Sequence, residues 1–236
     1  DFHAVTAQEP VVAVLASKAG LSPKVIYRDQ NWLVTEFIRA ETLCSSTLGL
    51  EAKLEIAATM LARCHQIVVG DDIKALSISE IVARQLSSMQ LSKEQEKTLA
   101  SIAQRLVQIS EVGPKVLCHG DANFSNILAD NQGQSWLIDF ECSFIGLPEF
   151  DLAMLMAINQ VPHQYLPSVI TAYQGHSAVG MNHQRVTQYL ACSYFINGLW
   201  FFKHANHSQH SANYLKLAKQ QFNCFDQMRC VPERLT

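Results

Sequence analysis

The chain has 236 residues, of which 48% are hydrophobic and 17% charged, and its formal net charge is −3 at pH 7. This composition is typical of a folded protein with a sizeable core and excludes an intrinsically disordered chain. The slightly negative charge argues against broad nucleic-acid binding, which needs a basic surface. Because no apolar run is long enough for a membrane span and no signal-peptide pattern opens the chain, we expect a cytoplasmic protein with neither nucleic acid nor membrane as a partner.

The seven cysteines are scattered along the chain, and no two of them form a C-x-x-C pair. Their odd number and irregular spacing argue against a disulfide framework or a zinc site. We interpret them as reduced and mostly buried thiols, which fits a cytoplasmic location.

The first forty residues predict a small α+β unit. Residues 9–19 have few polar side chains and stop at Gly20, a common helix terminator. β-branched and aromatic residues favour strands at 24–27 and 32–38, with a turn at 29–31 between them. A helix and two strands bury too little apolar surface to fold alone, so this unit must pack against the rest of the chain.

The remainder of the chain predicts a helical lobe with a small sheet at its centre. Apolar residues recur at helical spacing, and Ser92 followed by Gln95 has the pattern of a helix N-terminus. The expected helices are 50–67, 78–89, 92 to about 109, 149–159, 163–174, 182–204 and 211–228. The expected strands are 116–118, 126–129 and 135–140, with a turn at 130–133 between the last two.

Three polar residues, His119, Asp121 and Asn126, lie in a loop between short apolar runs, and Asp139 ends the next apolar segment. Transfer of a γ-phosphoryl group needs positioned metal ions and a group that orients the acceptor hydroxyl. Asp121 is the candidate catalytic base, and Asn126 and Asp139 are candidate oxygen ligands of Mg²⁺. His119 belongs to the same catalytic segment, where we expect it to brace the loop through hydrogen bonds. Glu141 could face the metal, a substrate cation or a hydrogen-bond donor.

Each of these residues also has a structural alternative. An isolated His-Gly-Asp can be a turn, and an asparagine a few residues later can cap the next element. The joint pattern H-x-D-x-x-x-x-N, then a strand, a turn, I-D-F-E and D-L-A, is much less expected by chance. We therefore favour a phosphoryl-transfer site.

The stretch 119–155 resembles the aminoglycoside phosphotransferase and choline/ethanolamine kinase family, which is related to the protein kinases. The family signature of H-G-D, Asn, I-D-x-E and D-L-A stands at residues 119–121, 126, 138–141 and 151–153. The resemblance implies an α+β, protein-kinase-like fold. Its truncated small N-terminal lobe and hinge would be residues 1–39, and its mostly helical C-terminal lobe with the catalytic loop would be residues 40–236.

The resemblance also implies roles for single residues. Asp121 would be the catalytic base and Asn126 and Asp139 the Mg²⁺ ligands, in agreement with the chemistry above. Asp151 would be a structural carboxylate that holds the catalytic loop. His65 matches the end of a family helix that closes with L-x-x-x-H.

Nucleotide binding in this family implies further residues. Backbone groups of Glu36 and Ile38 would contact the adenine of ATP at the hinge. Glu9 matches the glutamate that pairs with a lysine on an earlier strand, but only eight residues precede Glu9, and they include neither Lys nor Arg nor a Gly-rich loop. Three explanations are open: a further N-terminal segment, a divergent kinase, or an inactive one. We expect the first, because the sequence does not begin with Met.

Two features in the C-terminal part of the sequence have both a structural and a functional interpretation. His204, His207 and His210 are spaced by three residues, which we interpret as the end of a helix rather than a metal site. The aromatic cluster Tyr194, Phe195, Trp200, Phe201 and Phe202 fits core packing, although aromatic faces could also form an acceptor pocket for a cationic alcohol.

Taken together, these patterns predict a small-molecule kinase that uses ATP and Mg²⁺ to phosphorylate a hydroxyl of a small metabolite. The resemblance implies choline, ethanolamine or thiamine as the small-molecule alcohol substrate, and the low number of carboxylates after Asp151 favours a small, singly charged acceptor. The alternatives are an aminoglycoside-type phosphotransferase and a catalytically inactive kinase-like binding protein.

Overall fold

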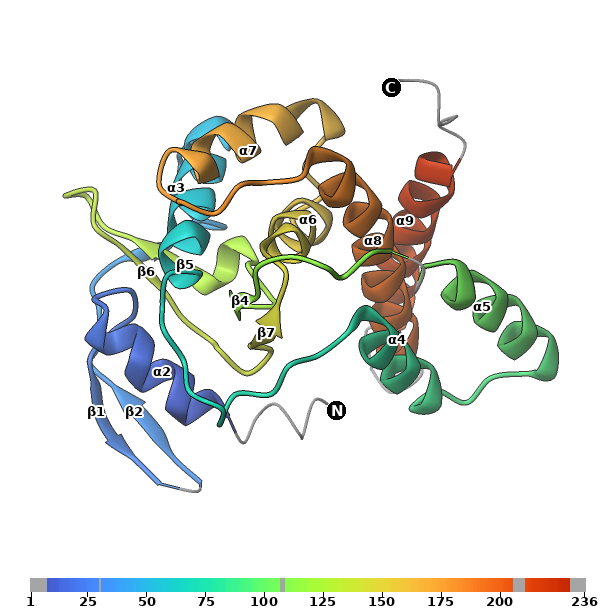
Figure 1. Cartoon of the computed structure of the whole chain (residues 1–236), viewed down its shortest axis with the longest axis horizontal. Coiled ribbons are helices and arrows are strands. Elements are labelled where there is room, and N and C mark those ends of the chain that lie inside the picture. Colours follow the sequence, from blue (N-terminus) through green and yellow to red (C-terminus); the bar gives the residue numbers. More distant parts are fainter. Residues whose placement is uncertain (1–7, 30, 107–108, 206–210, 230–236) are drawn as a thin grey trace.

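The structure, a computed structural model, describes residues 8–29, 31–106, 109–205 and 211–229 (Figure 1). Its first element is helix α2 (Glu9–Lys18), which has Pro10 in its first turn. Gly20 comes after the helix with a φ of 64°, a left-handed conformation that glycine adopts without strain. The predicted helix 9–19 is therefore confirmed to within one residue.

Strands β1 (Val25–Arg28) and β2 (Leu33–Thr35) form an antiparallel hairpin next to α2 (Figure 1). Asp29 closes its turn, because its Oδ1 accepts hydrogen bonds of 2.8 Å from the backbone N–H groups of Asn31 and Trp32. The predicted strand 32–38 is too long. Strand pairing with the four-residue β1 ends at Thr35, and after one further hydrogen bond from the N–H of Glu36 to the carbonyl oxygen of Lys24 the chain leaves the hairpin.

The central strands form two small sheets. Strands β3 (Glu41–Thr42), β5 (Ile127–Ala129) and β6 (Ser135–Leu137) are antiparallel in the order β3-β5-β6. Strand β4 (Val116–Cys118) pairs with β7 (Phe144–Gly146) in a separate two-stranded sheet. The sequence did not predict β3 and β7, which are short and extended only because of the strands beside them.

Two predicted strand boundaries are wrong in a way that matters for the motif. Asn126 belongs to the 3₁₀ turn η1 (Phe124–Asn126) and not to the strand after it. The predicted strand 135–140 ends at Leu137, because Asp139 has a φ of 66°, which a continuing strand does not allow. Both residues thus lie in sharply turning backbone beside the β5–β6 hairpin.

The helices occupy most of the remaining chain, close to their predicted positions. They are α3 (Leu50–Cys64), α4 (Ile78–Ser87), α5 (Lys93–Leu106), α6 (Pro148–Ile158), α7 (Leu166–Gln174), α8 (His183–Ala205) and α9 (Ser211–Arg229), with a 3₁₀ turn η2 (His163–Tyr165) before α7. Ser92 and Gln95 exchange hydrogen bonds at the start of α5, as predicted. The predicted end of that helix at 109 comes after residues 107–108, which lie outside the described residues.

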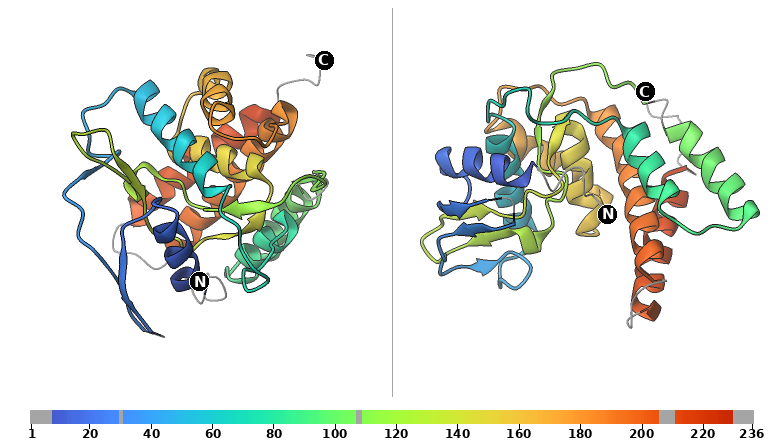
Figure 2. Two further views of the ribbon diagram at one scale, coloured as in Figure 1. Left: turned by 60° about the vertical axis from the view of Figure 1, so that its left-hand side comes forward. Right: turned by 90° about the horizontal axis from the view of Figure 1, so that it is seen from below.

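Helix α6 lies at the centre of this arrangement, with α3 and α7 on one side and the α8–α9 hairpin on the other (Figures 1 and 2). Every residue of α6 from Pro148 to Ala157 is buried. Core packing therefore fixes α6 on all sides, which makes it a rigid support for the loop after β4. Among the described helices, none combines the length and apolar character that a membrane crossing needs.

Candidate active site

The loop after β4 is tied to α6 by a buried carboxylate. Backbone N–H groups of His119 and Gly120 donate hydrogen bonds of 2.6 and 2.8 Å to the two carboxylate oxygens of Asp151, in the first turn of α6. Gly120 has a φ of 81°, so the chain turns sharply immediately before Asp121. Asp151 thus occupies the place of the loop-holding carboxylate that the family resemblance implied.

Asp151 is also the centre of a buried polar chain. His65, the C-cap residue of α3, places Nε2 at 2.9 Å from Oδ2 of Asp151 and Nδ1 at 2.8 Å from the Tyr173 hydroxyl of α7. Burial alone would raise the pKa of Asp151, but the hydrogen bond from His65, the electrostatic interactions with His65 and His119 and the backbone hydrogen bond from Gly120 hold it below its ordinary value. The ionised carboxylate is therefore the form that accepts these bonds.

His65, Cys118 and Asp151 offer atoms that lie within 4.8 Å of one another, which resembles a metal site in composition. Their contacts argue otherwise. Both ring nitrogens of His65 are already hydrogen-bonded, and Sγ of Cys118 donates to the carbonyl oxygen of Leu147 at 3.5 Å. Because these atoms already have partners within the protein, we interpret this cluster as structural.

His119 braces the loop from inside. Its ring is fully buried, with Nε2 3.0 Å from the carbonyl oxygen of Ile138 and Nδ1 accepting the backbone N–H of Asp121 at 3.2 Å. The ring also packs edge-on against Phe140 at 5.0 Å. With both nitrogens bound to backbone, His119 links the loop of Asp121 to the segment that carries Asp139.

Asp121 and Asn126 face each other across the loop. The amide Nδ2 of Asn126 donates to the backbone oxygen of Asp121 at 3.1 Å and to its Oδ2 at 3.2 Å. The other carboxylate oxygen of Asp121, Oδ1, is buried and has no hydrogen-bond partner in the part of the chain that the structure describes. One oxygen of this carboxylate is thus oriented by the protein, and the other is not satisfied by it.

The β5–β6 hairpin brings Asn126 and Asp139 to the same end. Ile127 pairs with Leu137, and the backbone N–H of Ile138 donates to the carbonyl oxygen of Asn126 at 3.0 Å. Asp139 is the next residue. Residues thirteen positions apart in the sequence therefore meet beside Asp121, because the hairpin folds back with this register.

Negative charge accumulates around this point. Burial raises the pKa of Asp121 above its usual value; the neighbouring His119 opposes the shift and the charge of Asp139 adds to it. The pKa of Glu141 is also raised, by burial and then by Asp139 and Asp121. Glu9, from the first turn of α2, has its pKa raised by burial and then by the charges of Asp139 and Glu141.

The structure therefore brings Glu9, Asp121, Asn126 and Asp139 into one electrostatic neighbourhood. Their side chains offer carboxylate and amide oxygens as ligand atoms, which are the hard ligands that Mg²⁺ prefers. The buried oxygen of Asp121 without a donor among the described residues and the like charges beside it both fit a site that holds a divalent cation.

Glu36 and Ile38, the two predicted hinge residues, follow β2 in the chain. Glu36 is exposed and Ile38 is half-buried. The backbone N–H of Glu36 donates to the carbonyl oxygen of Lys24 at 2.8 Å, so it is already engaged in the hairpin. Of the two backbone polar groups of Glu36, the carbonyl is the better candidate for a contact beyond the hairpin.

One residue that contacts the loop was missed by the sequence patterns. Asn159, the C-cap of α6, accepts the backbone N–H of Phe124 at 2.9 Å and donates to the carbonyl oxygen of Ala122 at 3.1 Å. These partners are 35 and 37 residues away in the sequence. Its only local signal was its place at the end of a predicted helix, where asparagine is common.

The late aromatic residues divide into two groups. Tyr194 and Phe195 are buried in the core, as the packing interpretation predicted. Trp200 is half-buried, stacks on His204 with ring centroids 3.9 Å apart and lies 6.1 Å from Tyr214. His207 and His210 lie outside the described residues.

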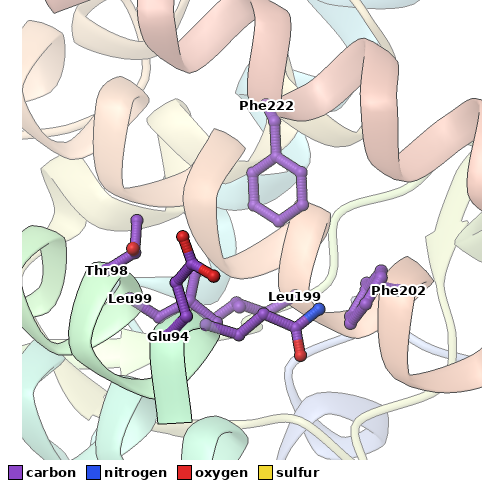
Figure 3. Close-up of a pocket in the computed structure, with 7 residues that line it drawn as sticks. Glu94, Thr98, Leu99, Leu199, Phe202 and Phe222 are labelled. Atoms are coloured by element: carbon purple, nitrogen blue, oxygen red, sulfur yellow. The ribbon is translucent and has the colours of Figure 1, made fainter. Parts of the chain in front are cut away.

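A pocket of about 370 Å³ lies between α5, α8 and α9 (Figure 3). It is lined by Glu94, Gln95, Thr98, Leu99, Leu199, Phe202 and Phe222. None of the residues that the motif singled out borders it, and its walls are mainly apolar.

Comparison with known proteins decides the family. A model of the family described as "Phosphotransferase enzyme family" matches residues 2–185. The chain belongs to this family. The phosphotransferase is thus an enzyme that transfers phosphate, and its motif residues 119–155 all lie within the matched range. No curated protein sequence matches it.

Solved structures agree on the fold of the phosphotransferase. A choline/ethanolamine kinase family protein from Mesorhizobium loti is 21% identical with a TM-score of 0.75, over 97% of this chain and 80% of that chain. The ethanolamine kinase of Plasmodium vivax is 15% identical with a TM-score of 0.74, over 94% and 73%. A spectinomycin phosphotransferase solved with AMP is 16% identical with a TM-score of 0.62, over 97% and 85%. The phosphotransferase has the expected α+β, protein-kinase-like fold.

Proposed function

We propose that the phosphotransferase transfers the γ-phosphate of ATP to the hydroxyl of a small cationic alcohol. The observation that carries this proposal is the arrangement of Asp121, Asn126 and Asp139. One loop and one hairpin end bring them together, and Asp121 retains a buried oxygen without a donor among the described residues.

Asp121 acts as the catalytic base in this proposal. The acceptor oxygen bonds to the γ-phosphorus while the bond between that phosphorus and the β,γ-bridging oxygen breaks, so ADP leaves and the hydroxyl proton passes to Asp121. Asn126 holds Oδ2 of Asp121, which leaves Oδ1 for the incoming hydroxyl. The raised pKa of Asp121 makes it a stronger base than an exposed aspartate, which favours proton uptake.

Asn126 and Asp139 are the proposed ligands of Mg²⁺. When bound, Mg²⁺ would neutralise charge that develops on the phosphate oxygens. Strand β6 ends at Leu137, and Asp139 follows it in a left-handed backbone conformation. The carboxylate of Asp139 is therefore not part of the alternating side-chain pattern of the strand. Glu141 is proposed to hydrogen-bond or attract a cation in the same neighbourhood, where its pKa is raised by burial and then by Asp139.

Residues 1–39 are proposed as an N-terminal lobe remnant and hinge, with the adenine contacts in the hinge. The carbonyl of Glu36 and the N–H of Ile38 would contact the base, since the N–H of Glu36 already pairs with Lys24. The AMP complex of the spectinomycin phosphotransferase, a protein of the same fold, supports nucleotide use. Glu9 is proposed to pair with a cationic group at the nucleotide phosphates.

Choline, ethanolamine or thiamine is the proposed class of acceptor. The low number of carboxylates after Asp151 supports a singly charged alcohol over an aminoglycoside, whose several amines need acidic partners. The choline/ethanolamine kinase family protein and the ethanolamine kinase, which share the fold, give the same indication.

The test is steady-state kinetics of the full-length protein with ATP and Mg²⁺ against choline, ethanolamine, thiamine and an aminoglycoside. Mg²⁺-dependent ADP release with at least one small amino alcohol, at a higher kcat/KM than with the aminoglycoside, is the expected result. Turnover with the aminoglycoside alone would contradict a small amino alcohol as the acceptor and support an aminoglycoside-type phosphotransferase. No acceptor-dependent turnover at all would favour an inactive kinase-like binding protein.

A further inference from the structure

The segment 119–126 is held against α6 at two separate points. Asp151, in the first turn of α6, binds the N–H groups of His119 and Gly120. Asn159, immediately after the last turn, binds the backbone on the far side of Asp121. At 1.5 Å per residue these attachment points lie about 12 Å apart along the helix axis. The loop that carries Asp121 is therefore hydrogen-bonded to both ends of α6 and not only to its first turn.

The side-chain amide of Asn159 makes three hydrogen bonds. Its Oδ1 accepts from the N–H of Phe124 at 2.9 Å, and its Nδ2 donates to the carbonyl of Ala122 at 3.1 Å and to that of Leu155 at 2.8 Å. The hydrogen bond to Leu155 fixes the amide on α6, and the hydrogen bonds to Phe124 and Ala122 hold the loop backbone. The amide thus joins the rigid central helix directly to the loop backbone.

Only one orientation of this amide satisfies its neighbours. A flipped amide would place its oxygen against the carbonyl oxygens of Ala122 and Leu155, and its nitrogen against the N–H of Phe124. Three hydrogen bonds would become three repulsive contacts. The surroundings therefore demand a side chain that both donates and accepts, which aspartate and leucine of similar size cannot do.

The two residues that Asn159 binds, Ala122 and Phe124, lie on either side of Asn123, between the proposed base and the proposed metal ligand. Asp121 precedes Ala122, and Asn126 comes two residues after Phe124 and donates back to the carbonyl of Asp121 at 3.1 Å. Movement of this turn would change the spacing of Asp121 and Asn126. The hinge residues are on a different segment and would not be displaced.

We propose that Asn159 is a positioning residue for phosphoryl transfer, acting through the backbone of residues 122–124. The inference rests on the proposed function, since Asp121 and Asn126 are the groups it places. Small displacements of reacting groups cost about 100-fold in rate. Loss of the hydrogen bonds from Asn159 to the loop should thus lower kcat and leave the KM for ATP nearly unchanged.

The test compares Asn159→Ala and Asn159→Asp with a matched control, Asn182→Ala. Asn182 also uses its side-chain oxygen to accept a backbone N–H, that of Arg185 at 3.0 Å, but at the start of α8. We expect Asn159→Ala to lower kcat by about 30- to 100-fold with the KM for ATP changed less than about threefold. Asn159→Asp should also lose activity, because it keeps the acceptor for Phe124 and loses both donated bonds. Asn182→Ala should retain the parent kcat.

Hydrogen exchange of backbone amides supplies a readout that does not depend on turnover. In Asn159→Ala the N–H of Phe124 should exchange faster, while the N–H of Gly120, held by Asp151, stays as protected as in the parent. Unchanged kcat in both Asn159 variants, or an equal loss in Asn182→Ala at equal thermal stability, overturns the inference. Absence of turnover in the parent protein overturns the proposed function instead, and exchange at Phe124 then decides whether Asn159 fixes the loop.

Discussion

At the scale of single residues, the site depends on backbone positions that admit few side chains. Gly120 has a φ of 81°, and a Cβ placed there would lie 2.3 Å from the carbonyl oxygen of Cys142. The left-handed conformation and the close approach of backbone both require glycine. The residue just before Asp121 is therefore fixed by sterics rather than by chemistry.

Gly120→Ala should be severely destabilising and should lower activity, because backbone at Cys142 must move to accept the methyl group. Gly133 is a matched control, since its φ is 82° and nothing lies within 4 Å of a Cβ added there. The left-handed penalty alone is about 1–2 kcal/mol. Thermal unfolding should show that loss for Gly133→Ala and a clearly larger one for Gly120→Ala. Equal losses would contradict the close contact.

Asp151 gives a pH-dependent prediction. Its pKa in the folded protein lies below the ordinary value, so its stabilising effect is complete above the unfolded pKa of about 3.9 and is lost as the pH falls through the folded pKa. Asp151→Asn should thus be less stable than the parent by about 1–3 kcal/mol at neutral pH. In urea unfolding the difference should shrink as the pH approaches about 2. A difference independent of pH would show that the carboxylate charge is not what the loop requires.

At the scale of elements, the α8–α9 hairpin is packed too closely to admit a larger residue. A Cβ added at Gly198 of α8 would lie 2.6 Å from the ring of Phe222 on α9. Phe222 also contacts the ring of Phe195, with centroids 6.2 Å apart, and borders the pocket beside α5 (Figure 3). Close packing here overrides helix propensity, which by itself favours alanine over glycine.

Gly198→Ala should therefore destabilise the protein by about 1–2 kcal/mol, despite the gain in helix propensity. The smaller side chain of Phe222→Leu should relieve the contact, so the loss in the double variant should be less than the sum of the single losses. Chemical denaturation of the four proteins measures this coupling. Stabilisation by Gly198→Ala alone would mean that the ring moves aside into the neighbouring pocket without cost.

Helices and strands differed in how far the sequence predicted them. The pattern of apolar residues located the helices to within a few residues, because each buries one face or, for α6, its whole surface. Strand ends were less accurate, because pairing partners set them: β2 stops where β1 ends, and the two-residue β3 exists only beside β5. The left-handed turn at Asp139, which ends β6, had no sequence signal.

The candidate site was predictable where spacing carried information. Asp121, Asn126, Asp139 and Asp151 were all found through one motif, and the structure brings them together around a loop and a hairpin end. Asn159 could not be found, since its partners across the fold are backbone groups that any sequence supplies. Contacts to backbone leave no pattern in the partner residues.

At the scale of the whole molecule, the buried helix α6 connects the site to the core. Its first turn and its C-cap hold the two sides of the proposed catalytic loop, while α3 contacts Asp151 of α6 through His65, which also binds Tyr173 of α7. In the proposed function, such a rigid centre would keep the reacting groups in place, as catalysis by positioning requires. The arrangement matches membership of the phosphotransferase family.

The most direct test of the central claim is to measure turnover and nucleotide binding for Asp121→Asn in the full-length protein. The amide keeps the size of the side chain and cannot take up the hydroxyl proton, so kcat should fall by about 100- to 10,000-fold. The Kd for Mg²⁺-ATP, measured by calorimetry, should stay within about threefold of the parent value, since Asn126 and Asp139 are untouched. Retained turnover, or a loss of nucleotide binding that accounts for the lost activity, would contradict the role of Asp121 as the base.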